Sequence, residues 1–328
     1  MNRFNIHIHR LCFLSPAFLG DAEPKGAWRT PPFKHLLRAW WRVAWAAEHD
    51  PGDWRRMRHE EGVLFGHAWL EGDHSEDGSP VHARRSQVLV RLRPWKQGKM
   101  KTIPRLRPAA AGRAASSELY LGYGPVKGAG ELKHPAIDAG EGAELRLAWP
   151  REHQRSMQRT LALIHAFGTL GGRSRNGWGS IHLEGIEPPD LTPYLRPWEE
   201  ALTQDWPHAI GKDGQGALIW RTDEVSDWQG VMERLAAIRK AVNGEAGSRE
   251  RPILNQPVTR NPRGRGRMPS NLGFKVCQAG EGAYYGLIYH LPHTPPPVAE
   301  VPIDTRLRLW QRIHRLLDRQ AQRLANGR

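Results

Sequence analysis

A glycine-rich segment with two arginines and a tryptophan, GGRSRNGWGS at residues 171–180, is the strongest local signal of chemistry in the sequence. Glycine lets the backbone approach a ligand closely and turn its N–H groups toward an anion. Arg173 and Arg175 would add fork-shaped donors for phosphate, while Trp178 could stack on a base or fill the core. The segment is neither a GxGxxG nor a P-loop, because it lacks the Lys-Ser/Thr ending and opens no helix. A plain helix-to-strand turn with exposed arginines is the alternative. The predicted contact residues are Gly172, Arg173, Ser174, Arg175, Asn176, Gly177 and Trp178.

A second group of cations follows helical spacing just after residue 30. Thr30 is a predicted helix cap, with Pro31 at the first helical position. The apolar stripe of this helix contains Phe33, Leu36, Leu37, Trp40, Ala44 and Ala47. Another stripe contains Lys34, Arg38, Trp41, Arg42 and Trp45. Basic residues interleaved with aromatic ones suit single-stranded nucleic acid, so the helix is expected to bury one side and present a basic, aromatic side.

Arginines also recur near the end of the chain. The predicted last helix, residues 303–324, carries a stripe of Arg308, Arg312, Arg315, Arg319 and Arg323. This stripe would contact RNA or an acidic partner surface, or it is simply a solvated face. Residues 259–269 form a flexible basic arm by composition, with Arg263, Arg265 and Arg267 as further candidates for RNA or partner contact.

Three residues could support catalysis instead. Asp21 precedes the first helix, and His7 with His9 share one strand face, where an imidazole could deprotonate a ribose hydroxyl. The plainer interpretations are a turn for Asp21 and a polar strand face for the histidines. The His pair lacks an obvious third metal ligand. The acidic run at residues 71–77 could bind a cation, but it is expected to be a solvated loop. The sequence therefore predicts no catalytic residue, no metal site and no cofactor.

The pattern of elements predicts an α+β fold. The first half gives strands at 3–13, 86–95, 144–149 and 180–186, with helices at 30–47 and 151–167, which is the βαββαβ order of a ferredoxin-like unit. In the first strand, Phe4, Ile6 and Ile8 alternate with Asn5, His7 and His9, so the apolar set is expected to be the buried one. Residues 96–142 are rich in Gly, Pro, Ala and cations and are expected to form a long insertion or hairpin.

The second half repeats this order incompletely. Strands are predicted at 217–221, 272–277 and 284–291, helices at 227–242 and 303–324, and no last strand is evident. The prediction is therefore a tandem of ferredoxin-like domains, 1–188 and 189–328, with the second incomplete or irregular. The first domain carries the insertion at about 96–142, and the second carries the basic arm and the last helix.

The composition limits the partners. The chain has 328 residues with 48 Lys and Arg against 34 Asp and Glu, a net charge of +14, which favours a polyanion as ligand. No apolar run approaches the ~20 residues of a membrane span, and polar residues interrupt the start too often for a signal peptide. Two cysteines, Cys12 and Cys277, are too few for a disulfide framework, which predicts a cytoplasmic location.

Four segments in order along the chain resemble the RAMP superfamily of CRISPR-associated RNA-binding proteins. Residues 15–42, SPAFLGDAEPKGAWRTPPFKHLLRAWWR, are similar to the family opening that ends in L-R-x-W-W-R, with His35 where the family usually has Gly. VLFG at 63–66 and RRSQVLVRL at 84–92 resemble its F-G…S-x-V pattern. GGRSRNGWGSI resembles its glycine-rich loop, and residues 268–292 resemble its C-terminal strand pair, with Asn271 at a position more often proline-like. The match is closest to the first-named subunit of the type III-B Cmr effector complex.

The resemblance implies tandem ferredoxin-like folds and a non-catalytic subunit that holds the 3′ part of a guide RNA. Its partners would be guide RNA, target RNA and other RAMP subunits, with no membrane. Two alternatives stay open: a RAMP-type endoribonuclease, since relatives include RNA-cleaving subunits, and a scaffold without direct RNA contact. Beside the glycine-rich loop, the implied RNA face contains Lys25, Arg29, Lys34, Arg38, Arg42 and Arg85.

Overall fold

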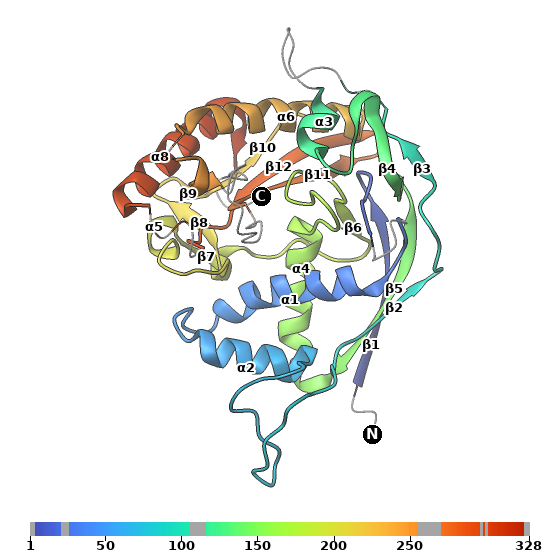
Figure 1. The fold of residues 1–328 in the computed structure, drawn as a ribbon, viewed down its shortest axis with the longest axis vertical. Helices are drawn as coiled ribbons and strands as arrows, with labels where there is room; N and C mark the ends of the chain where they lie inside the picture. The colour runs from blue at the N-terminus through green and yellow to red at the C-terminus, as the bar shows by residue number, and fades with distance from the viewer. Residues whose placement is uncertain are drawn as a thin grey trace.

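Two four-stranded antiparallel sheets dominate the computed structural model, each with helices on one face (Figure 1). The structure describes residues 4–20, 26–104, 106, 116–248, 250–254, 270–295, 298 and 301–324. The first sheet takes its strands from before residue 188 and the second from after it. The domain boundary at 188 stays a prediction.

The first unit contains β1 (Phe4–Phe13), α1 (Thr30–Ala46), β2 (Leu89–Arg93), β5 (Gly142–Pro150), α4 (Gln154–Phe167) and β6 (Ile181–Leu183). Its strand order, β2-β5-β1-β6, is that of a βαββαβ ferredoxin-like unit. A further helix, α2 (Trp54–Phe65), follows α1 and was not predicted. Within the insertion, β3 (Met100–Thr102) pairs with β4 (Glu131–Ala136), and α3 (Ser117–Gly122) with the 3₁₀ turn Gly128–Gly130 lies between them.

The second unit contains β10 (Ile219–Arg221), α6 (Trp228–Glu245), β11 (Leu272–Gly280), β12 (Ala283–His290), α8 (Ile303–Gln320) and β13 (Gln322–Arg323). The order β11-β12-β10-β13 is again ferredoxin-like, so the tandem fold is confirmed. The last strand, which the sequence did not reveal, has only two residues. Because α8 ends at Gln320, Arg323 belongs to this strand and not to the arginine stripe.

A small connecting sheet joins the two units. It contains β7 (Leu195–Pro197), β8 (Ile210–Asp213) and β9 (Gly216–Ala217), together with the short helix α5 (Trp198–Ala201). Further 3₁₀ turns lie at Arg151–His153, Thr192–Tyr194 and Arg251–Leu254.

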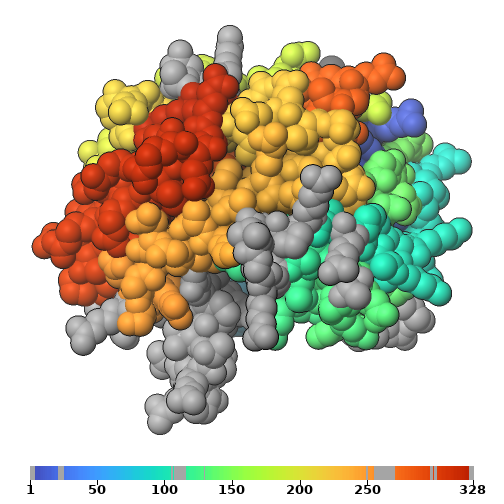
Figure 2. All heavy atoms as spheres, turned by 90° about the horizontal axis from the view of Figure 1, so that it is seen from above, coloured from blue at the N-terminus to red at the C-terminus, as the bar shows by residue number. Residues whose placement is uncertain are grey.

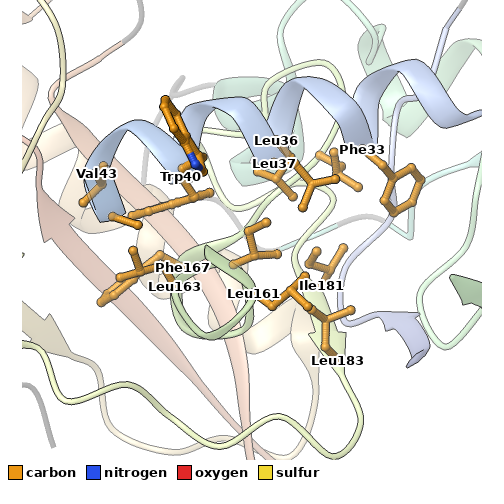
Figure 3. Packing of buried hydrophobic residues seen from close by; sticks show 14 of the residues in the cluster. Phe33, Leu36, Leu37, Trp40, Val43, Leu161, Leu163, Phe167, Ile181 and Leu183 are labelled. Carbon is orange, nitrogen blue, oxygen red and sulfur yellow. The ribbon is translucent and has the colours of Figure 1, made fainter. Parts of the chain in front are cut away.

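Helices α1 and α4 pack against each other through the predicted apolar stripe of α1. Phe33, Leu36, Leu37 and Trp40 are buried facing α4 and β6 (Figure 3). The second sheet closes the other side of this helix pair, since the Tyr289 hydroxyl of β12 donates to the Phe167 carbonyl at 3.0 Å. Helices α1 and α4 therefore lie between the two sheets.

The prediction for the faces of β1 was wrong. Ile6 and Ile8 are 65% and 55% exposed, whereas His7 faces inward, stacked 4.3 Å from Trp149. Side chains alternate between the two faces of a strand, and Leu11 and Phe13 are fully buried further along β1. The odd-numbered residues of β1 therefore face inward. In the cross-strand pairing, Ile6 and Leu89 both lie opposite Ala148, so an apolar row crosses the outer face of the first sheet.

Candidate nucleic-acid interface

Three adjoining hollows follow the solvent side of α1. The middle one is lined by Lys34, His35, Arg38 and Arg42. Lys34 continues into a second hollow that also contains Arg85. Arg38 and Arg42 continue into the third, which reaches Arg58 on α2. We call this surface, with its five cations Lys34, Arg38, Arg42, Arg58 and Arg85, the α1 face. Arg58 was not predicted, because α2 itself was missed.

A single buried carboxylate holds two of these arginines. Glu61 of α2 is 2% exposed and accepts from Arg38 Nε at 3.1 Å and from Arg42 Nε and Nη2, each at 2.9 Å. Burial alone would raise the pKa of Glu61, but the hydrogen bonds from Arg42 and Arg38 lower it below its usual value. Both arginine side chains remain 36% exposed, so each guanidinium is fixed in place with part of its surface toward solvent.

The predicted aromatic partners on α1 are wrong. Trp41 and Trp45 are 3% and 4% exposed. Helix α2 covers them: Trp41 meets the edge of Phe65, and the Trp45 indole donates to Glu60 at 2.8 Å. They fill the core between α1 and α2 and cannot stack on a ligand.

Other aromatic residues line the third hollow of the α1 face. Trp69 is 64% exposed and stacks on His82, while Trp54 is 42% exposed. The loop that carries Trp69 is fixed by Asp73, which bonds Arg84 and His67. The Arg84 hydrogen bond is the main reason that the pKa of Asp73 falls to about 2. The acidic run at 71–77 is therefore not simply solvated, because Asp73 is 3% exposed and anchors the loop.

The glycine-rich loop joins the two units. The Arg175 carbonyl accepts from the Phe274 N–H of β11 at 3.1 Å, and the Arg175 guanidinium donates to the Ser270 carbonyl at 3.0 Å. The Asn176 side chain donates to the Leu121 carbonyl of α3. Gly179 has φ +64°, and a Cβ there would lie 1.9 Å from the Leu170 carbonyl oxygen. Glycine is needed here for close approach within the protein.

Trp178 belongs to the core. It is 0% exposed and packs 5.0 Å from Phe18 and 6.2 Å from Trp228, measured between ring centroids. Of the two roles open to it, base stacking and core filling, the structure has the second. The loop therefore contributes to the core through Trp178. Gly172 is exposed, and Arg173 and Ser174 are half-buried.

Cations of both the α1 face and the loop act on the charge of His35. Burial lowers the pKa of His35, and the charges of Arg42, Arg38 and Arg175 lower it further. Arg175 therefore shares an electrostatic environment with the α1 arginines, although one of its nitrogens is bound to Ser270. Of the two predicted parts of the interface, α1 contributes the more exposed cations.

The remaining candidates are scattered. Lys25, Arg263, Arg265, Arg267 and Asp21 lie outside the described residues. Arg29 donates to the Gly20 carbonyl at 2.6 Å. On α8, Arg308, Arg315 and Arg319 are exposed. Arg312 is bound to Glu250 at 2.9 Å, and Arg323, on β13, forms an ion pair with Asp213.

The predicted polar face of β1 points inward. His7 Nε2 lies 3.2 Å from Gln154 Oε1, and its ring is 6.3 Å from that of His9. Burial is the main cause of the lowered pKa of His9, and the neighbouring His7 adds to it. Among the described residues, no group of three His, Cys, Asp or Glu side chains is placed to hold a metal ion. No helix in the described ranges is long and apolar enough to cross a bilayer.

The chain is similar in arrangement to the solved structure of Cmr1 from Pyrococcus furiosus in its apo form. The two share 16% sequence identity with a TM-score of 0.48, over 97% of each chain. No family model matches the chain, and no curated protein does. The assignment of the fold depends on the strand order of the two sheets and not on this likeness.

Proposed function

We propose that this protein is a non-catalytic RNA-binding subunit of a type III-B CRISPR effector complex, and that it holds the 3′ part of the guide RNA. The four segments that resemble the RAMP superfamily support the assignment to that class of complex. The observation that supports RNA binding best is the α1 face, where five cations border adjoining hollows beside the exposed Trp69.

The chemistry of this face suits an RNA backbone of any sequence. Guanidinium groups held by Glu61 offer donors to phosphate oxygens without adjusting to each nucleotide. Phosphate contacts fix the strand without selecting bases, which a guide of variable sequence requires. A neighbouring exposed tryptophan provides a stacking surface that every base can use.

The same proposal includes target RNA and other RAMP subunits as partners, in the cytoplasm. We assign contact with a neighbouring subunit to the outer face of the first sheet. Ile6, Ala148 and Leu89 form an apolar row on this face. Apolar residues grouped on a protein surface commonly mark protein contacts.

The test is binding of unrelated single-stranded RNAs to the whole chain at increasing salt. We expect similar affinities for all sequences and a fall of about 0.7 log units in the association constant per tenfold salt for each phosphate contact. An affinity that is independent of salt would contradict the proposal.

The same samples, analysed on denaturing gels, test the enzyme alternative. We expect intact RNA. Specific products that disappear in Asp21→Ala, His7→Ala or His9→Ala would show that the protein is a ribonuclease.

A further inference from the structure

A cleft between the two units encloses about 570 Å³, within the usual range for small-ligand sites. The first unit contributes His165 and His182 to its lining, and the second sheet contributes Arg221, Lys275, Cys277 and Tyr285. This cleft is separate from the α1 face, because no lining residue is shared with the three hollows there.

Lys275 is the unusual member of this lining. It is 1% exposed, and its ammonium donates to the His165 carbonyl. Lys275, Leu287 and Arg221 are cross-strand neighbours in the second sheet. This part of the sheet faces the first unit, because the Lys275 ammonium bonds the His165 carbonyl. No ion pair joins Lys275 to a carboxylate within the described part of the chain. Burying a charge without a counter-ion is costly, and burial lowers the pKa of this amine to about 8.

The surrounding groups do not neutralise this charge. Arg221 lies 4.1 Å above the Tyr285 ring and pairs with Glu224, so this lining cation is itself compensated. Burial lowers the pKa values of His165 and His182 and raises that of the Cys277 thiol, which keeps all three groups neutral near pH 7. Glu187 is the acidic residue of the lining.

The rest of the lining is largely apolar. Leu14, Phe167, Leu191 and Leu287 border the cleft together with Pro188. Such walls would contact the carbon skeleton of a ligand, while an ammonium with unused donors would take a single anionic group. A cleft of this kind therefore suits a molecule that has an apolar or aromatic body and one negative end.

We propose that this cleft binds a small organic anion, whose phosphate or carboxylate group pairs with Lys275 and whose apolar or aromatic body contacts the walls. The proposal does not depend on RNA binding, since Lys275 is not on the α1 face. Phosphate and carboxylate share the chemistry that Lys275 recognises, and the probes below separate them.

The experiment uses the whole chain with two probes that share an aromatic ring, phenyl phosphate and benzoate, in titration calorimetry and thermal unfolding. We expect saturable binding of at least one probe, with a rise in melting temperature. The probe that binds more tightly identifies the anionic group. Absence of saturable binding by both probes would overturn the proposal.

The decisive variant is Lys275→Met, which replaces the ammonium by an apolar group of similar length. We expect at least a tenfold loss of probe affinity, a melting temperature equal to or above that of the parent protein without ligand, and unchanged RNA affinity. The matched control is Lys240→Met, an exposed lysine of α6, which should alter none of these. Probe binding to Lys275→Met equal to that of the parent would overturn the proposal.

A second variant, Glu187→Gln, keeps the test independent of the folding of the lysine variant. Removing this acid from the lining should strengthen binding of the anionic probe severalfold. Weaker binding in Glu187→Gln would contradict the assignment of the cleft to an anion.

Discussion

The α1 face and the glycine-rich loop look alike in sequence and differ in the structure. Both combine arginines with tryptophan, and both resemble RNA-binding segments of the same superfamily. On α1, Arg38 and Arg42 are held by Glu61 with 36% of each side chain exposed. In the loop, Arg175 donates to a main-chain carbonyl and Trp178 is 0% exposed. The difference shows that similar residue compositions can leave arginines partly exposed or build a junction between two sheets.

What separates the two regions is how their polar groups are satisfied. The Gly177 carbonyl accepts from both Ser15 and Ser180, and the Ser180 hydroxyl in turn accepts from the Val276 N–H of β11. These bonds link the loop to both units. On α1, the outward guanidinium surfaces keep donors that a phosphate can reach.

The largest expected effect is on stability, in Trp178→Ala. Emptying this fully buried position should lower the free energy of unfolding by about 3–5 kcal/mol. RNA affinity per folded molecule should stay unchanged, because the indole has no exposed surface. Denaturant unfolding and a binding titration corrected for the folded fraction measure the two quantities. A large loss of RNA affinity in a stably folded variant would assign Trp178 to the ligand after all.

The next effect concerns the arginine pair of the α1 face. We would change Arg38, Arg42 and Glu61 together to Gln, because removing the arginines alone would leave a buried charge without a partner. Hydrogen bonds to charged groups contribute about 1.5–3 kcal/mol each, and both arginines are partly exposed, so we use the lower value. The loss of two contacts should therefore weaken RNA binding by about 3 kcal/mol, roughly a hundredfold. The salt slope should flatten by about 1.4 for two lost contacts.

The matched control for this triple variant removes the same number of charges from the outer face of the first sheet. Arg91, Arg146 and Glu144 lie on neighbouring strands there, with Glu144 paired to Arg146. Changing these three to Gln should alter RNA affinity by less than about threefold, since contacts beyond a Debye length are largely screened. Equal losses in the two triple variants would show that net charge, and not the α1 face, determines binding.

A smaller effect is expected from Trp69→Ala. If bases stack on this exposed ring, RNA binding should weaken by about 1–3 kcal/mol. Stability should change little, since the ring is 64% exposed. The control is Trp95→Ala, an equally exposed tryptophan at 67% that lines none of the hollows of the α1 face. A greater loss of RNA affinity in Trp95→Ala than in Trp69→Ala would move the interface toward the end of β2.

Periodicity predicted most of the fold, because the helices and long strands have strong local patterns. It missed α2, in which charged residues are as numerous as apolar ones, and β13, which is too short to show alternation. It assigned the faces of β1 wrongly, since the inward set begins with Asn5 and His7, which bond Gln154 instead of filling an apolar core. In the candidate interface, α1 cations were predictable from charge and spacing. The burial of Trp41 and Trp45 was not, because it depends on α2.

The smallest effect is expected from the arginine stripe of α8, although its charge density in the sequence rivals that of α1. Figure 2 shows α8 on the surface beside α6. Arg308, Arg315 and Arg319 are exposed along it, and Arg312 is already bound to Glu250.

None of these four arginines lines a hollow of the α1 face, and none has a buried carboxylate like Glu61 to fix it toward a ligand. Exposed arginines lose side-chain entropy when they bind, which offsets much of their attraction for phosphate. Arg315→Ala with Arg319→Ala should therefore change stability by less than about 0.5 kcal/mol and RNA affinity by less than about threefold at 0.15 M salt, where the Debye length is about 8 Å. A flattening of the RNA salt slope as large as that of the α1 triple variant would show that RNA also contacts α8. Arginines held by a buried carboxylate would then no longer identify the interface.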